Sequence, residues 1–293
     1  MSIPGSTVGA VGVVGSGAMG RGIAESIIRA GLTVLLHDTN PDALRAASKQ
    51  IGSSLQRSVD KVQITPLEAE TWMSGLHTGG DLADFSQCDL IIEAVPEILD
   101  LKLNLLRQVE LHVQPAAVIA TNTSSIPITT LSTALEGKSR FLGLHFFNPV
   151  PRMRLVEIIP TILTSGHTVG VAEEFVRNQL EKTPLVIADR PGFAVNALLI
   201  PYLLSAARML DNGYATAKNI DDGMKLGCGH PVGPLELADF IGLDVVCHVA
   251  DSIYAETKDP ANIVPNNLRR LVEAGHLGRK TAQGFHDHAE PAR

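Results

Sequence analysis

A glycine-rich segment near the start of the chain constrains the fold more than any other feature. The apolar run Val8 to Val14 leads into Gly15-Ser16-Gly17-Ala18-Met19-Gly20, and a stretch with helical periodicity follows. This order predicts a strand, a tight turn and a helix. The first glycine permits the sharp turn, the second lets the backbone approach a pyrophosphate, and the third lets the helix pack closely on the strand. The amides of residues 15 to 20 would then face phosphates at a helix N-terminus.

An acidic residue follows at the spacing that such a loop requires. Thr33 to Leu36 is a second β-rich run, and Asp38 lies just after it, eighteen residues beyond Gly20. A carboxylate at this place accepts hydrogen bonds from the adenosine ribose hydroxyls and repels a 2′-phosphate. The glycine pattern alone fits ordinary glycine turns as well as it fits a dinucleotide-binding loop. Together with Asp38 it predicts a dinucleotide site that takes NAD rather than NADP.

Strand and helix patterns alternate over residues 8–188. Residues 41–76 have the pattern of a helical pair, and further β-rich runs lie at 90–94, 118–121, 141–144, 155–159 and 185–188. This predicts an α/β fold with a doubly wound, mainly parallel sheet of the Rossmann type. The β-rich runs cease at Asp189, so we predict an NAD-binding domain over 1–189 and a helical C-terminal domain over 190–293 that completes the substrate site. The apolar helix from Ala197 to Leu210 suggests a homodimer interface there.

Charge and composition exclude several classes of partner. The chain has 293 residues with 24 Lys+Arg and 31 Asp+Glu, a net charge of −7, which repels nucleic-acid phosphates and anionic lipids. The longest apolar helix-like run, Ala197 to Ala207, is far shorter than the roughly 20 residues that span a bilayer. Three cysteines without a C-x-x-C pair, and a start without the charges of a signal peptide, indicate a cytoplasmic protein. We therefore expect neither nucleic acid nor membrane as a partner.

A histidine and an acid lie in neighbouring apolar runs. His145 follows the run 141–144, where a lone histidine would more often be structural. Glu157 lies inside a strand pattern, where burying an unpaired carboxylate would cost on the order of several kcal/mol. If the proline-rich stretch 148–154 turns the chain back, a hairpin places the two residues opposite each other. A glutamate on one imidazole nitrogen fixes the tautomer and raises the basicity of the other, as a proton acceptor for an alcohol requires.

Other polar residues allow two interpretations each. Ser124 follows the run 118–121 and either faces a ligand crevice or caps the next helix. Asn196 lies in an apolar segment. Its amide either binds a ligand or belongs to a residue at the start of a helix whose hydrogen bonds are satisfied there. His286 and His288 form an H-x-H pair near a polar tail, but no third ligand has metal-site spacing, so we expect no metal.

Several longer motifs occur together in this chain. They are Gly15-x-Gly17-x-Met19-Gly20-x-Gly22-Ile23-Ala24, Glu93-Ala94-Val95-Pro96-Glu97, Thr121-Asn122-Thr123-Ser124-Ser125, Leu144-His145-Phe146-Phe147-Asn148-Pro149, Leu155-Val156-Glu157 and Pro191-Gly192-Phe193-x-x-Asn196. In combination they resemble the L-3-hydroxyacyl-CoA dehydrogenase family over nearly the whole chain, and the free-standing length is similar to that of its 3-hydroxybutyryl-CoA dehydrogenases. The resemblance implies reversible NAD-linked hydride transfer between a short-chain (S)-3-hydroxyacyl-CoA and the 3-oxoacyl-CoA.

The resemblance also implies roles for individual residues. His145 would be the catalytic base and Glu157 its orienting partner, and Ser124 and Asn196 would bind the reacting substrate oxygen. Positions near the cofactor's ribose and nicotinamide are matched by Glu97, Lys102, Ser124, Asn148 and Lys280, and positions near coenzyme A by Ser54 and Lys61. The chain departs from the family beside Lys61, where Asp60, Val62 and Gln63 replace the usual lysines, and near its end, where Ala282, His286 and His288 replace a glycine and two aromatics.

Two rival functions remain open on the sequence alone. One is a related hydroxy-acid dehydrogenase of the gulonate type, which the pair Phe146-Phe147 after His145 disfavours. The other is a non-catalytic nucleotide-binding protein of the kind represented by crystallins of similar fold. The presence of both His145 and Glu157 argues against that second alternative.

Overall fold

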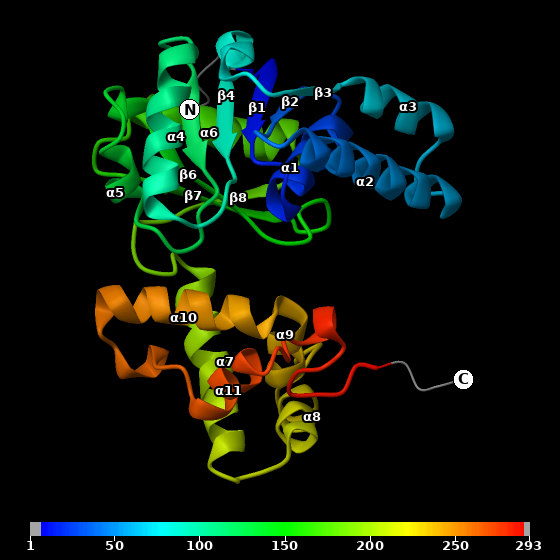
Figure 1. Ribbon diagram of the computed structural model, residues 1–293, viewed down its shortest axis with the longest axis vertical. Coiled ribbons are helices and arrows are strands. Elements are labelled where there is room, and N and C mark those ends of the chain that lie inside the picture. The colour runs from blue at the N-terminus through cyan, green and yellow to red at the C-terminus, as the bar shows by residue number, and fades with distance from the viewer. Residues whose placement is uncertain (1–6, 290–293) are drawn as a thin grey trace. The chain divides into compact units, whose positions relative to one another are not determined.

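An eight-stranded sheet forms the centre of the first structural unit (Figure 1). The computed structural model describes residues 7–289, and within them every pair of neighbouring strands is parallel except β6 and β7. The strand order is β3-β2-β1-β4-β5-β6-β7-β8. The strands are β1 (Ala10–Val14), β2 (Thr33–His37), β3 (Leu76–Gly79), β4 (Leu90–Glu93), β5 (Val118–Thr121), β6 (Phe141–Phe146), β7 (Leu155–Pro160) and β8 (Thr183–Val186). This confirms the doubly wound, mainly parallel sheet.

Helices connect the strands and cover the sheet. They are α1 (Ala18–Arg29), α2 (Pro41–Asp60), α3 (Pro66–Ser74), α4 (Leu99–His112), α5 (Ile128–Ser132) and α6 (Gly166–Glu174), with a π-helical turn η3 (Phe175–Gln179) and the 3-10 turns η1 (Leu82–Gln87) and η2 (Lys138–Arg140). The helical pair predicted over 41–76 is confirmed as α2 and α3. Asn40 caps α2 by accepting hydrogen bonds from the backbone of Asp42 and Ala43, and Thr65 with Glu68 forms a capping box on α3.

The core of this unit lies between the sheet and α1. Ile23 and Ile27 on one face of α1 have no exposed surface, and neither do Val13 and Leu36 on the central strands. Burying each such side chain contributes roughly 1.5–3 kcal/mol. The near-continuous apolar strands follow from this burial, because a parallel sheet covered on both faces exposes neither side of its strands.

The second unit is helical and has a core of its own. The chain divides between Asp189 and Arg190. The helices are α7 (Val195–Asp211), α8 (Ala217–Cys228), α9 (Pro234–Ile241), α10 (Leu243–Thr257) and α11 (Asn266–Glu273), with the 3-10 turns η4 (Pro260–Asn262) and η5 (Arg279–Thr281). Leu203, Leu204, Val246 and Ala250 lie at the centre of its core. In the described part of the chain, no helix is long and apolar enough to cross a membrane.

Three strand positions differ from those expected. The strand expected over 185–188 is β8 at Thr183–Val186, because its parallel ladder pairs with Leu155–Ile158 of β7. The edge strand β3 was not predicted, because its central residues His77 and Thr78 are exposed and it forms no apolar run. The run 141–144 extends to Phe146, so that His145 lies inside β6 rather than after it. The extension follows from the antiparallel ladder, which continues to the pair Phe146 and Val156 and supplies partners for the additional backbone groups.

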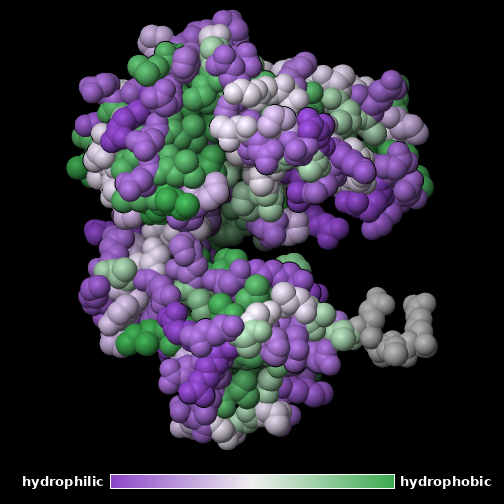
Figure 2. Space-filling view, viewed as in Figure 1, coloured by the Kyte–Doolittle hydropathy of each residue, from purple (hydrophilic) through white to green (hydrophobic). Residues whose placement is uncertain are grey.

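The surface of the first unit is uneven in polarity. Figure 2 shows hydrophilic side chains covering α2 and an apolar area over α4. The apolar contribution of α4 includes Leu101 and Leu111, which are 41% and 75% exposed.

The start of α5 has its own capping residue. Asp189 accepts hydrogen bonds from the backbone amides of Ile128 at 3.0 Å and Thr129 at 2.7 Å. Ser124 lies four residues before α5 and makes no capping bond to it. The helix-cap interpretation of Ser124 is therefore wrong, because a carboxylate some sixty residues away in the sequence already satisfies the helix N-terminus.

We expect Asp189→Ala to lower the free energy of unfolding by about 1 kcal/mol, since it leaves the first amides of α5 without an acceptor. Ser124→Ala is the matched comparison and should stay within about 0.5 kcal/mol of the parent protein. Urea denaturation followed by circular dichroism measures both changes. Equal destabilisation by the two substitutions would contradict the assignment of the cap to Asp189.

Candidate active site

The glycine loop between β1 and α1 has open space at one position only. Gly15 has a φ of +101°, and a Cβ there would lie 2.6 Å from the carbonyl oxygen of Ala94. A Cβ on Gly20 would lie 1.8 Å from the carbonyl oxygen of Gly15, whereas a Cβ on Gly17 would meet nothing within 4 Å. Gly17 is also the N-cap of α1 and supplies no side-chain cap. The loop therefore presents free helix amides beside an open space, which fits a pyrophosphate group.

Asp38 lies immediately after β2 and is held by this loop. One carboxylate oxygen accepts hydrogen bonds from the amide of Ser16 at 2.9 Å and its hydroxyl at 2.8 Å, and the other accepts one from the amide of Asn40 at 3.0 Å. Burial disfavours the charged form, but the hydrogen bonds from Asn40 and Ser16 outweigh it and hold the pKa of Asp38 below its ordinary value. An ionised carboxylate in this place suits ribose hydroxyls and repels a 2′-phosphate.

A buried ion pair lies at the carboxyl end of β4. The ammonium of Lys102, 1% exposed, lies 2.6 Å from Glu93, 3.1 Å from the carbonyl oxygen of Val95 and 3.2 Å from Glu97. These three acceptors match the three N–H groups of a lysine. Lys102 therefore acts on its surroundings through Glu97 and the loop after β4, and we infer a positioning role for it.

Glu97 organises the loop that carries Ser124. Its carboxylate accepts hydrogen bonds from the amides of Ser124 at 3.0 Å and Ser125 at 3.1 Å, and from the hydroxyls of Thr123 and Ser125. Burial opposes ionisation of Glu97, but the charge of Lys102 and the hydroxyl hydrogen bonds lower its pKa below the usual range. The loop is thereby fixed, while the half-buried Ser124 hydroxyl has no bonding partner within residues 7–289.

His145 and Glu157 face each other across β6 and β7. The register pairs the two residues, as the hairpin predicts, and His145 Nδ1 lies 2.7 Å from Glu157 Oε2. Both are buried, with 5% and 0% exposure. A carboxylate beside Nδ1 assigns the imidazole proton to that nitrogen and leaves Nε2 as the basic atom. The ring of Phe147 packs edge-on at 4.6 Å between centroids and restricts the imidazole further.

The loop with Ser124 and the strand with His145 come together at one edge of the sheet. β5 and β6 run parallel, with Thr121 opposite Gly143. Ser124 and His145 therefore both lie just beyond this pair, toward the carboxyl ends of the strands. The side chain of Asn122 accepts a hydrogen bond from the amide of Phe146 at 2.8 Å and ties the two strand ends together. Ligands of open α/β sheets bind at this edge.

The remaining predicted residues of the C-terminal part lie in the second unit. Asn196 is half-buried and is the second residue of α7. Lys280 lies in η5 and pairs with Asp244, at 2.6 Å from its second carboxylate oxygen. His286 and His288 each bind one buried aspartate, Asp221 at 2.6 Å and Asp239 at 2.8 Å. Over residues 7–289 no group of His, Cys, Asp and Glu side chains is arranged to hold a metal ion.

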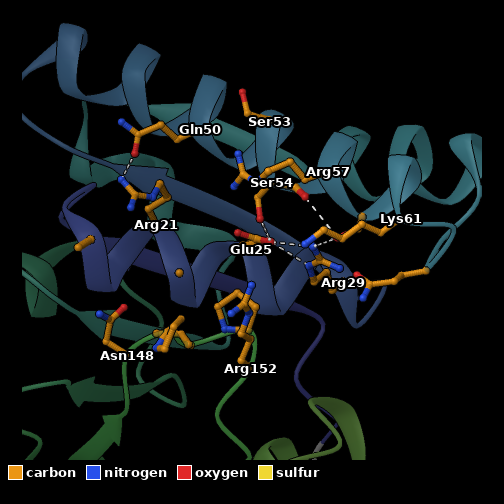
Figure 3. A pocket seen from close by; sticks show the side chains of 17 residues that line it. Arg21, Glu25, Arg29, Gln50, Ser53, Ser54, Arg57, Lys61, Asn148 and Arg152 are labelled. Atoms are coloured by element: carbon orange, nitrogen blue, oxygen red, sulfur yellow. Dashed lines mark hydrogen bonds and ion pairs between the residues drawn. The ribbon is translucent and has the colours of Figure 1, made fainter. Parts of the chain in front are cut away.

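A polar pocket of about 900 Å³ lies between α1, α2 and the loop after β6 (Figure 3). Ser54 lines it from α2, Lys61 lines it from the C-cap position just after α2, and Asn148 lines it from the loop. At its base the carboxylate of Glu25 accepts hydrogen bonds from the Ser54 hydroxyl at 2.8 Å and from Arg29 at 2.9 Å.

The sequence patterns did not single out the arginines of this pocket, which are Arg21, Arg29, Arg57 and Arg152. Helical spacing could have pointed to some of them. Ser54, Arg57 and Lys61 are three and four residues apart and share one face of α2. Arg21, Glu25 and Arg29 are similarly four apart along α1. Arg152 has no such pattern, because it lies in a loop.

Comparison with known proteins gives a consistent result over both units. Residues 10–190 match the model for "3-hydroxyacyl-CoA dehydrogenase, NAD binding domain", and residues 192–288 match the C-terminal domain of the same family. A 3-hydroxybutyryl-CoA dehydrogenase of Mycobacterium tuberculosis is 43% identical, covering 94% of this chain and 97% of that protein. The human mitochondrial hydroxyacyl-coenzyme A dehydrogenase is 38% identical, covering 94% and 90%. The crystal structure of an (S)-3-hydroxybutyryl-CoA dehydrogenase from Ralstonia eutropha has a TM-score of 0.92 and 39% identity, covering 97% of this chain and 100% of that one.

We expect the protein to bind NADH at least roughly tenfold more tightly than NADPH, because Asp38 repels a 2′-phosphate and a tenfold preference needs only about 1.4 kcal/mol. Asp38→Ser should bring the affinities for NADH and NADPH closer together. The matched control is Asp42→Ser, because Asp42 is an exposed carboxylate on α2 that pairs with Arg45. This substitution should leave the ratio of NADH affinity to NADPH affinity unchanged. Fluorescence titration with both reduced cofactors measures the ratio, and equal or tighter binding of NADPH by the parent protein would refute the role of Asp38.

Proposed function

The chain belongs to the 3-hydroxyacyl-CoA dehydrogenase family, and on that basis we propose that His145 and Glu157 are the base and its orienting partner in NAD-linked oxidation of a short-chain (S)-3-hydroxyacyl-CoA to the 3-oxoacyl-CoA. The observation that carries this proposal is the buried contact of 2.7 Å between His145 Nδ1 and Glu157. It leaves Nε2 free of the tautomeric proton at the edge of the sheet where ligands bind.

The chemistry follows from what each side chain can do. His145 Nε2 takes the proton of the substrate 3-hydroxyl, and the Glu157 carboxylate stabilises the imidazolium that forms. NAD supplies the acceptor for the hydride that leaves C3. In the reverse direction His145 returns the proton to the oxygen. Burial of both side chains strengthens their interaction, because water is excluded from it.

The other site residues bind or position. We assign the Ser124 hydroxyl to the reacting substrate oxygen, supported by its lack of a bonding partner within residues 7–289 and by a backbone that Glu97 fixes. Asn196 has the same role by family position. Glu97, Asn148 and Lys280 are assigned to the cofactor's ribose and nicotinamide, and Lys102 supports Glu97. Ser54 and Lys61 line the polar pocket and are assigned to coenzyme A.

Oxidation of NADH with acetoacetyl-CoA tests the proposed reaction directly. Activity with acetoacetyl-CoA and none with gulonate is the expected result. Gulonate turnover in its place would favour the hydroxy-acid dehydrogenase, and binding of NADH without turnover of either would indicate a protein that has lost catalysis.

His145→Ala should lower kcat by about 10²- to 10⁴-fold while the affinity for NADH changes little, because the proton acceptor is removed and the cofactor site is not. Glu157→Gln should be less severe, since it weakens the orientation and basicity of the imidazole without removing it. The control is His167→Ala, because His167 is an exposed histidine on α6. Its kcat should equal that of the parent protein. Steady-state kinetics with acetoacetyl-CoA decide, and wild-type turnover of His145→Ala would overturn the assignment.

We also propose that the chain forms a homodimer through α7. This helix is apolar around much of its circumference, yet Leu198 is 79% exposed and Met209 is 44% exposed in the single chain. Large apolar side chains grouped on one element are typical of an interface between subunits.

Leu198→Asp should yield monomers, because a charge without a partner is costly to bury in an apolar interface. Leu226→Asp on α8, where the leucine is 87% exposed, is the matched control and should not change the oligomeric state. Sedimentation equilibrium measures both proteins. If Leu198→Asp dimerises as tightly as the parent protein, α7 is not part of the dimer interface.

We infer a cytoplasmic location from the state of the thiols. Cys88, Cys228 and Cys247 are all unpaired. Burial raises the pKa of both Cys88 and Cys247 to about 11, so these two are unreactive. Unpaired structural thiols suit a reducing compartment.

A further inference from the structure

Lys182 lies just before β8 and binds the backbone of a loop instead of a carboxylate. Its ammonium donates hydrogen bonds to the carbonyl oxygens of Val150 at 2.8 Å and Met153 at 2.7 Å. Within residues 7–289 it forms no ion pair. Burial lowers the pKa of Lys182, because the ammonium loses part of its hydration. Its charge is therefore balanced by the carbonyl dipoles of a single loop.

The loop that Lys182 binds joins the two strands of the proposed base pair. It runs over residues 147–154, from the end of β6 to the start of β7. The chain beside Lys182 holds this loop at a third point, where the amide of Thr183 donates to the carbonyl oxygen of Arg154 at 2.6 Å. Two consecutive residues at the start of β8 thus bind three carbonyl groups of the loop.

The first of these carbonyl groups belongs to a residue that also contacts α1. The side chain of Val150 is 1% exposed and is part of the main core. A Cβ on Gly22 of α1 would lie 3.0 Å from a methyl carbon of Val150, so the helix and the loop are in close contact. Lys182 therefore fixes the backbone of a residue whose side chain packs on the helix after the glycine loop.

Asn148 lies between two fixed points of the chain. Two residues before it, the amide of Phe146 donates to the side chain of Asn122 at 2.8 Å. Two residues after it, the carbonyl oxygen of Val150 accepts the hydrogen bond of Lys182. Fixed residues on both sides leave the backbone of Asn148 few alternative conformations, and such restriction is what holds a ligand-binding side chain in place.

We propose that Lys182 is a positioning residue of the dehydrogenase, which holds Asn148 at the cofactor by binding the loop after β6. This inference rests on the proposed function, which assigns Asn148 to the ribose and nicotinamide of NAD. Lys182 acts through the backbone of the loop and is not assigned any contact with the cofactor. His145 and Glu157 are held by the strand ladder and by their own contact, so they do not depend on Lys182 in the same way.

A double-mutant cycle between Lys182 and Asn148 tests the proposal in the full-length protein. Lys182→Met removes the hydrogen-bond donors and keeps a long side chain, and Asn148→Ala removes the side chain that is positioned. Lys138→Met is the matched control, because Lys138 is a half-buried lysine in η2, just before β6 and at the opposite end of that strand from Asn148. Fluorescence titration measures the affinity for NADH, and steady-state kinetics with acetoacetyl-CoA measure kcat and the KM for NADH.

Lys182→Met should weaken NADH binding about tenfold and raise the KM for NADH by a similar factor, because small displacements of a positioned group are costly. Its kcat should change less than about threefold, since the proton acceptor remains. Adding Lys182→Met to Asn148→Ala should have little further effect, because no side chain remains to be positioned. Lys138→Met should bind NADH as the parent protein does.

Two outcomes would overturn the proposal. One is parent-like NADH affinity of Lys182→Met, and the other is a double variant in which the two losses multiply. Thermal unfolding followed by circular dichroism checks the fold, and Lys182→Met should melt within about 4 °C of the parent protein. If Lys182→Met does not fold, Lys182→Gln takes its place in the cycle with the same expected results.

The NADH titration separates this proposal from the proposed function. If acetoacetyl-CoA is not reduced but NADH binding responds to the cycle as expected, the proposed reaction is wrong and the role of Lys182 is supported. If acetoacetyl-CoA is reduced and Lys182→Met binds NADH as tightly as the parent protein, the role of Lys182 is wrong and the reaction is supported.

Discussion

The buried carboxylate of Glu93 is the contact on which the carboxyl edge of the sheet depends. It has no exposed surface, and it accepts hydrogen bonds from Lys102 and the Thr121 hydroxyl, each at 2.6 Å, and from the Val95 amide at 2.7 Å. Removing one partner of such a pair leaves an uncompensated buried charge, which typically costs about 3–5 kcal/mol. Through Lys102 the pair also holds Glu97. The end of β4, the end of β5 and the loop with Ser124 therefore form one connected unit.

The change of strand direction between β6 and β7 creates the second part of the site. In a wholly parallel sheet, consecutive strands are joined by crossovers, and residues close in sequence do not face one another. The one antiparallel pair described here folds back over a short loop and sets His145 directly opposite Glu157. Both side chains are buried, so the pair resists competition from water, and the same loop brings Asn148 and Arg152 to the wall of the polar pocket.

The parts that local pattern determines could be predicted from the sequence. The glycine loop, Asp38, the parallel sheet and the pairing of His145 with Glu157 all follow from periodicity, spacing or the cost of burying a charge. The edge strand β3 could not, because an exposed strand of four residues has no apolar pattern. The cap of α5 by Asp189 and the cluster of cations in the pocket could not either. Their members are close only after segments distant in sequence have folded together.

The concentration of charge in the pocket affects encounter as well as binding. An acyl-CoA carries several negative charges, and the net charge of −7 on this chain disfavours its approach. On the proposed assignment of the polar pocket to coenzyme A, the cations that line this pocket attract an approaching thioester toward it. Such steering is long-ranged only at low ionic strength, because the Debye length shortens to about 8 Å at 0.15 M salt. The association rate, rather than the chemical step, should therefore be the part of the catalytic cycle that responds most strongly to salt.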